Sequence, residues 1–288
     1  MEKEPVLRVV GVSKRFPGVQ ALSNVDFEVY PGEVVALLGE NGAGKSTLMK
    51  ILAGAYHKDT GHIFLRGQEI NPRDTAESQR LGIATIYQEF TLTPNQSAAA
   101  NIFVSREPRY GGLLRPFNLV NRRKMERDAV ALLDMVGARV PPGVIVEDLS
   151  VAERQQVEIA KALAVDAQVI IMDEPTSALG NDETRFLFEI VRNLRARGLS
   201  IIFITHRLEE VFEIADRIVV LRDGERVGTL STADATIDKI IRLMVGRDVG
   251  ELFQKEKVEI GEPVLRVEGL TRRGSVEDVS FELRKGEI

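Results

Sequence analysis

The residues best suited to chemistry form a glycine-rich run, Gly39-Glu40-Asn41-Gly42-Ala43-Gly44-Lys45-Ser46. This run fits the spacing G-x-x-x-x-G-K-[ST], in which glycines let backbone N–H groups turn inward around a phosphate. It lies between a short apolar run at 34–38 and a helical pattern that starts at Thr47, whose dipole also favours an anion. We therefore predict that Lys45 reaches the β- and γ-phosphates of a nucleotide and that the Ser46 hydroxyl holds Mg²⁺.

A second candidate pair, Asp173-Glu174, ends another apolar run at 169–172. An aspartate at the carboxyl end of a strand beside a phosphate loop is placed to hold Mg²⁺ through water, and a following glutamate can polarise an attacking water. Without such a loop, an Asp-Glu pair is more often a helix cap. Because the glycine-rich run at 39–46 is present, we interpret Asp173-Glu174 as residues that bind Mg²⁺ and water and not as a helix cap.

Composition excludes several other kinds of site. The chain has 288 residues, a formal net charge of −5, no cysteine and three scattered histidines, His57, His62 and His206. Disulfides, thiolate nucleophiles and zinc-thiolate sites are excluded, and a cage of histidines around a metal is not expected. The acidic balance argues against coating nucleic acid. Because we find neither a run of about 20 apolar residues nor a signal-peptide core, we expect a cytoplasmic protein.

Strand and helix patterns alternate up to residue 247, which predicts an α/β fold with a largely parallel sheet. A further apolar run at 201–204 predicts a central strand, and Asp223-Gly224 predicts a hairpin. Helices are predicted between Asn121 and Gly137 and from about 186 to Gly198. Residues 91–149 do not share the sequence pattern of the rest of this domain, and they predict an inserted helical subdomain with one long loop. Between 106 and 128, seven basic residues face three acidic ones, which fits either a solvated loop or a surface for anionic lipid or a partner.

The C-terminal part of the sequence repeats the N-terminal part. Pro5-Val6-Leu7-Arg8-Val9 recurs at 263–267, and the segment 25–34 is echoed at 279–288, with alternation typical of strands in both copies. The mostly charged segment between the copies resembles a linker. We predict a first domain at 1–247, a linker at 248–262, and the beginning of a second domain at 263–288 that stops before its own phosphate loop.

Together these motifs resemble the ATP-binding cassette (ABC) transporter ATPases over essentially the whole chain. The motifs occur in family order around one phosphate loop: Phe16, Gln88, the signature segment 149–153, the carboxylate motif 173–179, and Thr205-His206. The resemblance implies a P-loop NTPase fold with an N-terminal antiparallel β subdomain and a helical subdomain at about 91–163. Taken singly, Phe16, Gln88 and His206 would each be read as structural residues.

The resemblance also implies roles for single residues. Phe16 is expected to stack on adenine, Gln88 to contact Mg²⁺ and water, and His206 to assist at the γ-phosphate. The expected catalytic residues are Glu174, His206 and Gln88, and the expected Mg²⁺ ligands are Ser46, Gln88 and Asp173. The expected ATP-binding residues are Phe16, Gly39, Glu40, Asn41, Gly42, Ala43, Gly44, Lys45, Ser46, Thr47, Ser150, Val151, Ala152 and Glu153.

The signature segment departs from the family pattern L-S-G-G-Q. Ser150 and Glu153 form a capping box, so a helix should begin there with N–H groups that can bind an anion. In the family this helix end closes over the phosphate held by a partner cassette. Here Val151 and Ala152 replace both glycines, and Gly180 replaces a usual aspartate. We expect ATP binding and leave turnover by this half open.

Two cassettes fused in one chain are typical of monosaccharide importers of the ribose, galactose, xylose and arabinose type, and segments 155–161 and 242–247 are similar to that branch. The resemblance implies an ATPase on the cytoplasmic face of a membrane, peripheral to it. Its expected partners are transmembrane permease subunits, a second ABC domain and, indirectly, a sugar-binding protein, and no nucleic acid is expected. The alternatives are a soluble tandem ATPase acting on nucleic acid or ribosomes, or a cassette that binds ATP mainly structurally.

Overall fold

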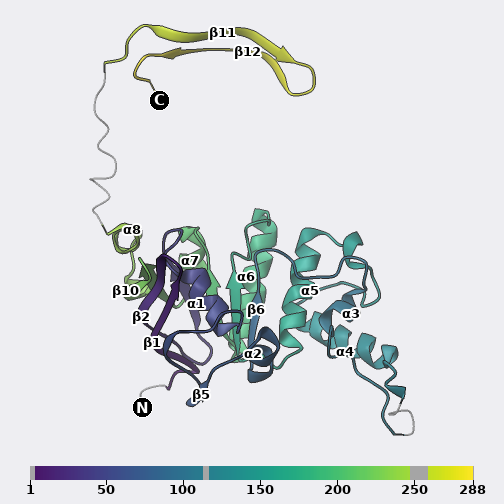
Figure 1. Cartoon of the computed structure of the whole chain (residues 1–288). Coiled ribbons are helices and arrows are strands. Elements are labelled where there is room, and N and C mark those ends of the chain that lie inside the picture. Colours follow the sequence, from purple (N-terminus) through teal and green to yellow (C-terminus); the bar gives the residue numbers. More distant parts are fainter. Residues whose placement is uncertain (1–3, 113–116, 247–258, 288) are drawn as a thin grey trace. The chain divides into compact units, whose positions relative to one another are not determined.

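The computed structural model describes residues 4–112, 117–246 and 259–287. They divide into two units, 1–246 and 247–288, of which each is described by itself (Figure 1). Most of the predicted linker, 248–258, lies outside the described residues. The predicted domain limits therefore remain a prediction.

A six-stranded sheet forms the centre of the first unit, in the order β10-β9-β3-β8-β7-β6. Five of its strands run parallel: β3 (Val34–Leu38), β6 (Ile83–Ile86), β7 (Val169–Asp173), β8 (Ser200–Ile204) and β9 (Arg217–Arg222). Every residue of β3 and β8 is buried, as a strand covered on both faces requires. The predicted α/β fold with a parallel sheet is confirmed. The edge strand β10 (Glu225–Ser231) returns antiparallel to β9 through the predicted turn at Asp223-Gly224.

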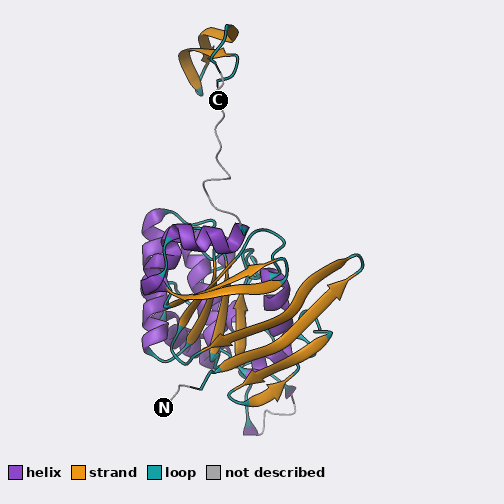
Figure 2. Cartoon of the chain, turned by 90° about the vertical axis from the view of Figure 1, so that its left-hand side faces the viewer, coloured by secondary structure: helices purple, strands orange, loops and turns teal. Residues whose placement is uncertain are grey.

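A second sheet is antiparallel and has the order β2-β1-β4-β5 (Figure 2). Its strands are β1 (Leu7–Phe16), β2 (Val19–Val29), β4 (Thr60–Leu65) and β5 (Gln68–Ile70). Alternate side chains such as Leu7, Val9 and Phe27 are buried in one cluster with Leu48 of α1 (Lys45–Leu52). This apolar cluster fixes the helix that follows the phosphate loop between the two sheets.

The helices α3 (Ala98–Ile102), α4 (Arg122–Met135) and α5 (Val151–Leu163) pack on one another on the side away from β1 and β2, which confirms the inserted helical subdomain (Figure 1). The Asn121 side chain accepts a hydrogen bond from Lys124 N, as its predicted N-cap role requires. The remaining helices are α2 (Thr75–Leu81), α6 (Asn181–Ala196), α7 (Leu208–Ile214) and α8 (Ile237–Val245). Short 3₁₀ turns lie at Val146–Asp148 and Thr232–Asp234.

The basic stretch at 106–128 contains both a backbone β-bridge and ion pairs. Arg109 and Val120 form an isolated antiparallel bridge, and Asp128 forms ion pairs with Lys124 and Arg127. The residues between 113 and 116 lie outside the described ranges. The choice between a solvated loop and a docking surface therefore stays open.

The second unit is a hairpin of β11 (Pro263–Arg272) and β12 (Val276–Arg284), and it repeats the β1–β2 pair in detail. Val267 pairs with Phe281 as Val9 pairs with Phe27. Three hydrogen bonds also recur at corresponding positions. Gly11 N to Asp26, Asn24 N to Ser13 and Tyr30 N to Glu33 correspond to Gly269 N to Ser280, Asp278 N to Thr271 and Arg284 N to Glu287. The sequence repeat is thus also a repeat of backbone conformation.

Candidate functional site

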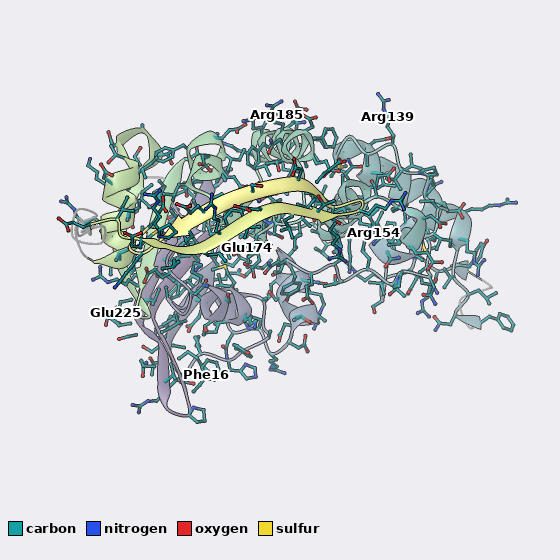
Figure 3. The ribbon with its side chains drawn as sticks, turned by 90° about the horizontal axis from the view of Figure 1, so that it is seen from above. Phe16, Arg139, Arg154, Glu174, Arg185 and Glu225 are labelled. Carbon is teal, nitrogen blue, oxygen red and sulfur yellow. The ribbon has the colours of Figure 1, made fainter. Side chains whose placement is uncertain are left out.

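A cleft of about 450 Å³ gathers most of the predicted site residues at the carboxyl ends of the parallel strands. Such ends meet at one edge of a sheet, where α/β folds bind ligands. The cleft is lined by Phe16, Val19, Ala21, Asn41, Gly42, Ala43, Gly44, Lys45, Ser46, Thr47, Gln88, Asp173, Glu174 and Ile204. Three larger hollows, of about 720, 610 and 600 Å³, lack this combination of groups. Figure 3 shows Phe16 on one side of Glu174 and Arg154 of α5 on the other.

The phosphate loop depends on glycine at its two ends. Gly44 has a φ of +101° and precedes α1, and a Cβ atom there would lie 2.7 Å from the Ala21 carbonyl oxygen. Gly39 has a φ of +152°, and its Cβ atom would lie 2.3 Å from the Leu221 carbonyl oxygen. A side chain at either position would displace the loop. The backbone path is therefore set by residue type, as the motif predicted.

Lys45 lies over this loop and is close to two carboxylates. Its Nζ atom donates to the carbonyl oxygens of Gly39, at 2.7 Å, and Glu40, at 3.0 Å. Burial lowers the pKa of Lys45, and the charges of Glu174 and Asp173 oppose that shift. Burial likewise raises the pKa of Asp173, Glu174 adds to the rise, and Lys45 and Lys50 act against it. The cleft thus holds one ammonium group and two carboxyl groups that are only partly exposed to solvent.

Glu174 has a strained backbone. Its φ is +46°, in the left-handed region, which costs a residue with a side chain about 1–2 kcal/mol. Its N–H donates to the Ile204 carbonyl oxygen at 3.0 Å, which joins the ends of β7 and β8. Strain of this kind is concentrated at functional sites. The conformation directs attention to Glu174 independently of its carboxylate.

His206 lies beside Glu174 and outside the lining of the cleft. The His206 Nδ1 atom is 3.3 Å from the Glu174 Oε1 atom, and the two side chains are 67% and 27% exposed. The ends of the neighbouring strands β7 and β8 therefore bring together two of the predicted catalytic residues, Glu174 and His206. The histidine stands at the open side, where a ligand or a partner could contact it.

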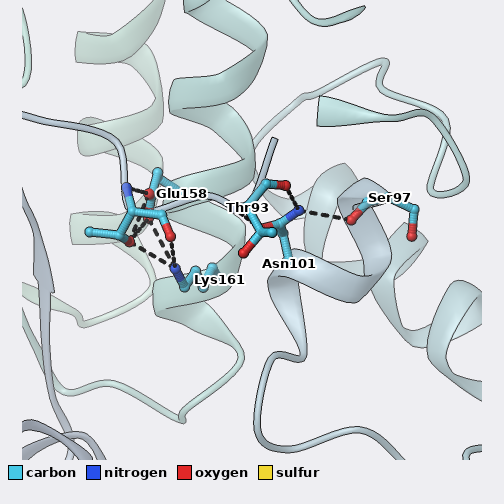
Figure 4. A network of polar contacts seen from close by, with 6 residues as sticks. Thr93, Ser97, Asn101, Glu158 and Lys161 are labelled. Carbon is cyan, nitrogen blue, oxygen red and sulfur yellow. Dashed lines mark hydrogen bonds and ion pairs between the residues drawn. The ribbon is translucent and has the colours of Figure 1, made fainter. Parts of the chain in front are cut away.

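Gln88 lines the cleft, and the segment after it is anchored to the helical subdomain (Figure 4). The buried Glu158 carboxylate of α5 accepts from Thr91 N at 2.5 Å and from Thr91 Oγ1 at 2.9 Å. Asn101 of α3, also buried, exchanges two hydrogen bonds with the backbone of Thr93. The sequence analysis missed both anchors. For Glu158 the available signal was an acidic residue on the apolar face of a predicted helix.

Phe16 is on the cleft wall, where its ring is in partial contact with solvent. Tyr56 meets it edge to face, with ring centroids 5.3 Å apart, and the Lys14 Nζ atom lies 5.5 Å from the ring centroid. A partly exposed ring on the wall of a cleft can stack on a base. Tyr56 was not predicted, and its only sequence signal is that it follows α1 closely.

Six predicted ATP-binding residues do not line the cleft: Gly39 and Glu40 at the start of the phosphate loop, and the four signature residues Ser150, Val151, Ala152 and Glu153. The signature residues lie elsewhere in the fold. They begin α5 in the helical subdomain, where the predicted capping box is present. Val151 is 37% exposed, so this helix end faces solvent. Gly180 likewise begins a helix, α6, and its N–H donates to Glu183 at 2.9 Å. The structure brings together the phosphate loop, Gln88, Asp173 and Glu174, and it leaves the signature segment apart from them.

None of the helices in the described ranges combines the length and the apolar character needed to cross a bilayer. A family model described as "ABC transporter" matches residues 22–177. The chain is 54% identical over 284 residues to the Ribose import ATP-binding protein RbsA 1 of Rubrobacter xylanophilus, an alignment that covers 99% of the chain and 56% of that protein. It is 48% identical to the Putative ribose/galactose/methyl galactoside import ATP-binding protein 1 of Agrobacterium fabrum, covering 100% of the chain and 56% of that protein. The chain thus spans little more than half the length of these curated relatives.

Solved structures with a similar fold include an ATP-binding cassette of an ABC transporter in its ADP conformation. Its TM-score is 0.72 at 23% identity, over 85% of this chain and 100% of the other. A dimeric cassette in a post-hydrolysis state with ADP and phosphate has a TM-score of 0.65 at 24% identity, over 78% and 98% of the two chains. At this level of identity the likeness concerns the fold alone.

Proposed function

The chain belongs to the ABC transporter family, and from that premise we propose that it binds ATP in the cleft and hydrolyses it as the ATP-binding subunit of a monosaccharide importer. The observation that carries the proposal is the meeting of the phosphate loop, Asp173 and Glu174 in one cleft, with His206 beside Glu174. The sugar is proposed because the relatives named above carry ribose and galactose in their names.

Each side chain has a definite task in this proposal. The backbone N–H groups of the loop and the N-terminus of α1 hold the β- and γ-phosphates, and Lys45 transfers its hydrogen bonds from the loop carbonyls to phosphate oxygens. Glu174 orients and polarises the attacking water. His206 contacts the γ-phosphate from the open side, and Phe16 stacks on the base.

The donors in the cleft fit a magnesium ion. Ser46, Gln88 and Asp173 all line the cleft, and hard oxygen donors such as their hydroxyl, amide and carboxylate groups suit Mg²⁺. The raised pKa of Asp173, caused by burial and by Glu174, also favours a nearby cation. Within the described ranges no group of three acidic, histidine or cysteine residues is placed to hold a metal ion by itself, so phosphate oxygens would complete the coordination. When bound, the ion would neutralise charge on the phosphates.

A second ABC domain is proposed as the partner that completes the site. The β11–β12 hairpin repeats the pairing and three hydrogen bonds of β1–β2, which supports its origin in a second copy of this fold. The exposed start of α5 does not line its own cleft, which supports a role for it in contacting a phosphate held by another cassette. Transmembrane permease subunits and a sugar-binding protein are proposed as further partners, with the chain peripheral on the cytoplasmic face of the membrane.

The decisive variant is Glu174→Gln, because it keeps the shape of the side chain and removes its basicity. We expect ATP affinity within about twofold of wild type and a fall in hydrolysis of at least about a hundredfold. Glu189→Gln on α6, which is exposed, is the matched control. Unchanged turnover in Glu174→Gln would remove Glu174 from the mechanism, and absent ATP binding in the wild-type chain would end the proposal.

The main alternative within the family is a cassette that binds ATP mainly as a structural partner. It is favoured by the capping box at Ser150, in which a carboxylate stands where the family has an amide. Vanadate trapping of nucleotide separates the two functions, since only a hydrolysing site retains ADP. A soluble ATPase acting on nucleic acid or ribosomes fits the net charge of −5 poorly. Copurification with ribosomes rather than with a permease would favour it.

A further inference from the structure

Glu210 is a buried acidic residue that the proposed reaction does not use. It belongs to α7, the helix that follows His206, and it is 5% exposed. A buried carboxylate needs hydrogen-bond donors from its surroundings. The origin of those donors indicates what Glu210 does.

Two threonine hydroxyls share one oxygen of Glu210. The Glu210 Oε2 atom accepts from Thr205 Oγ1 at 2.6 Å and from Thr176 Oγ1 at 3.0 Å, and both threonines are buried. The other oxygen, Oε1, lies 3.4 Å from the Arg207 Nη1 atom. The Thr205 hydroxyl oxygen accepts in turn from Arg207 N–H at 3.0 Å, so its proton is directed to Glu210. All these contacts together connect three segments of the chain.

The arrangement differs from ordinary helix capping. Glu210 is the third residue of α7, where an acidic side chain usually accepts from the N–H of the N-cap residue. Here the N–H of the N-cap residue, Arg207, is bonded to Thr205 instead. Glu210 is therefore free to bind hydroxyl groups from two other loops, and its role extends beyond its own helix.

The two threonines stand next to the two proposed catalytic side chains. Thr176 follows Glu174 by two residues, and Thr205 immediately precedes His206. One buried oxygen thus joins the loop after β7 to the loop after β8. A backbone hydrogen bond from Glu174 N–H to the Ile204 carbonyl oxygen also joins these segments. The His206 Nδ1 and Glu174 Oε1 atoms, which are 3.3 Å apart, belong to residues next to these hydrogen bonds.

The strained backbone of Glu174 makes such a support necessary. A non-glycine residue at a φ of +46° is held there only when its neighbours determine the conformation. The hydrogen bond from Thr176 to Glu210 fixes Thr176, which lies two positions after Glu174 in the same turn. Loss of the bond would let the turn relax and move the Glu174 carboxylate.

We propose that Glu210 is a positioning residue that sets the relative placement of Glu174 and His206 through Thr176 and Thr205. The inference rests on the proposed roles of Glu174 and His206 in ATP hydrolysis. It adds a buried residue that does not line the cleft. Its effect is exerted on the geometry of the pair, and therefore on the chemical step more than on ATP binding.

The first test needs no nucleotide. The chain has three histidines, so imidazole resonances in histidine-labelled protein are assigned by single replacements, and His57 and His62 serve as internal references. We expect Thr205→Val, Thr176→Val and Glu210→Met to shift the His206 resonances at constant pH and to leave those of His57 and His62 in place. Thr205→Ser, which keeps the hydroxyl, should restore the His206 signals. Glu213→Gln, on the same helix but in a surface ion pair with Arg192, is the matched control.

The second test separates chemistry from binding in the same variants. We expect kcat to fall on the order of tenfold to a hundredfold for Thr205→Val and Glu210→Met, with ATP affinity and KM within about twofold of wild type. Glu210→Gln should lose less than Glu210→Met, because an amide oxygen can still accept from both threonines. Turnover is measured with the full chain at a concentration where the wild type hydrolyses ATP.

The outcomes distinguish this inference from the proposed function. Unmoved His206 resonances in folded Thr205→Val and Thr176→Val protein would overturn the inference, whatever the ATPase result. An equal loss of ATP affinity and kcat would also overturn it, since it would indicate general disruption. If Glu210→Met does not fold, the two threonine variants decide the matter. A wild-type chain without ATPase activity would instead count against the proposed function, because the resonance test does not depend on hydrolysis.

Discussion

The Glu153 carboxylate closes onto Ser150 at the beginning of α5. Its Oε2 atom lies 2.9 Å from the Ser150 backbone N and 2.8 Å from the Ser150 Oγ atom. The Ser150 Oγ atom also accepts from Glu153 N–H at 3.3 Å. At this helix end, which could bind a phosphate, Ser150 is therefore hydrogen-bonded to the Glu153 carboxylate. That carboxylate also places a negative charge at the helix end.

Replacing Glu153 by glutamine should improve contact between this helix end and a phosphate of another cassette. Glutamine at this position retains a capping box, so α5 should stay intact. Removal of one like charge near a phosphate should strengthen ATP-dependent association by roughly 1 kcal/mol, or about fivefold. Sedimentation velocity with and without ATP measures the effect. Glu147→Gln, which removes a neighbouring exposed charge, is the control, and an equal gain there would show a general charge effect.

Asp173→Asn should raise the thermal stability of the nucleotide-free protein and abolish magnesium-dependent hydrolysis. The pKa of Asp173 is raised in the folded protein by burial and by Glu174, so its ionisation at neutral pH opposes folding. The cost is absent below about pH 4 and grows as the pH rises through the raised pKa. The variant should therefore have a higher Tm at pH 7 and an unchanged Tm near pH 3. A lower Tm at pH 7 would contradict the electrostatic account.

Asp182→Asn is the control for this effect. Its carboxylate is 97% exposed and forms a surface ion pair with Arg185, so the same change of charge should leave both the Tm and the hydrolysis rate nearly unchanged.

Asn101→Ala should weaken the connection between the cleft and the helical subdomain. Asn101 is 3% exposed, and its amide bonds the backbone of Thr93, Gln96 and Ser97. Removing it leaves buried backbone groups without partners, at a cost of about 2–3 kcal/mol. Urea denaturation measures the free energy of unfolding. Asn95→Ala, at an exposed position of the same segment, should change it by less than about 0.5 kcal/mol.

The parts of the fold that the sequence predicts are those set by local rules. Gly44 must adopt a positive φ before α1, Asn121 caps α4, and Asp223-Gly224 closes a hairpin, and each of these needs only a few neighbouring residues. The parallel strands were also predictable, because burial on both faces leaves a continuous apolar run such as 34–38.

The polar connections between distant segments could not be predicted in this way. Thr91 meets Glu158, and Thr176 meets Glu210, only after the sheet has brought their elements together. No periodicity or spacing in the sequence encodes such a pair. The position of the signature segment outside the cleft is likewise a consequence of the path of α5. Local patterns predicted most of the residues that line the cleft, whereas the buried polar residues that anchor their segments required coordinates.

The hydrolysis rate per molecule should rise with protein concentration. The signature residues 150–153 do not line the cleft of their own unit, so one copy lacks a group that the proposed closed site requires. At low concentration we expect ATP binding with little turnover, and a rate per molecule that rises as copies pair. Serial dilution with a continuous phosphate assay measures this dependence. Mixing with Lys45→Ala protein, which cannot hold phosphate but keeps its signature segment, should restore some activity to dilute wild type. A rate per molecule that stays constant and brisk on dilution would show that a single copy suffices.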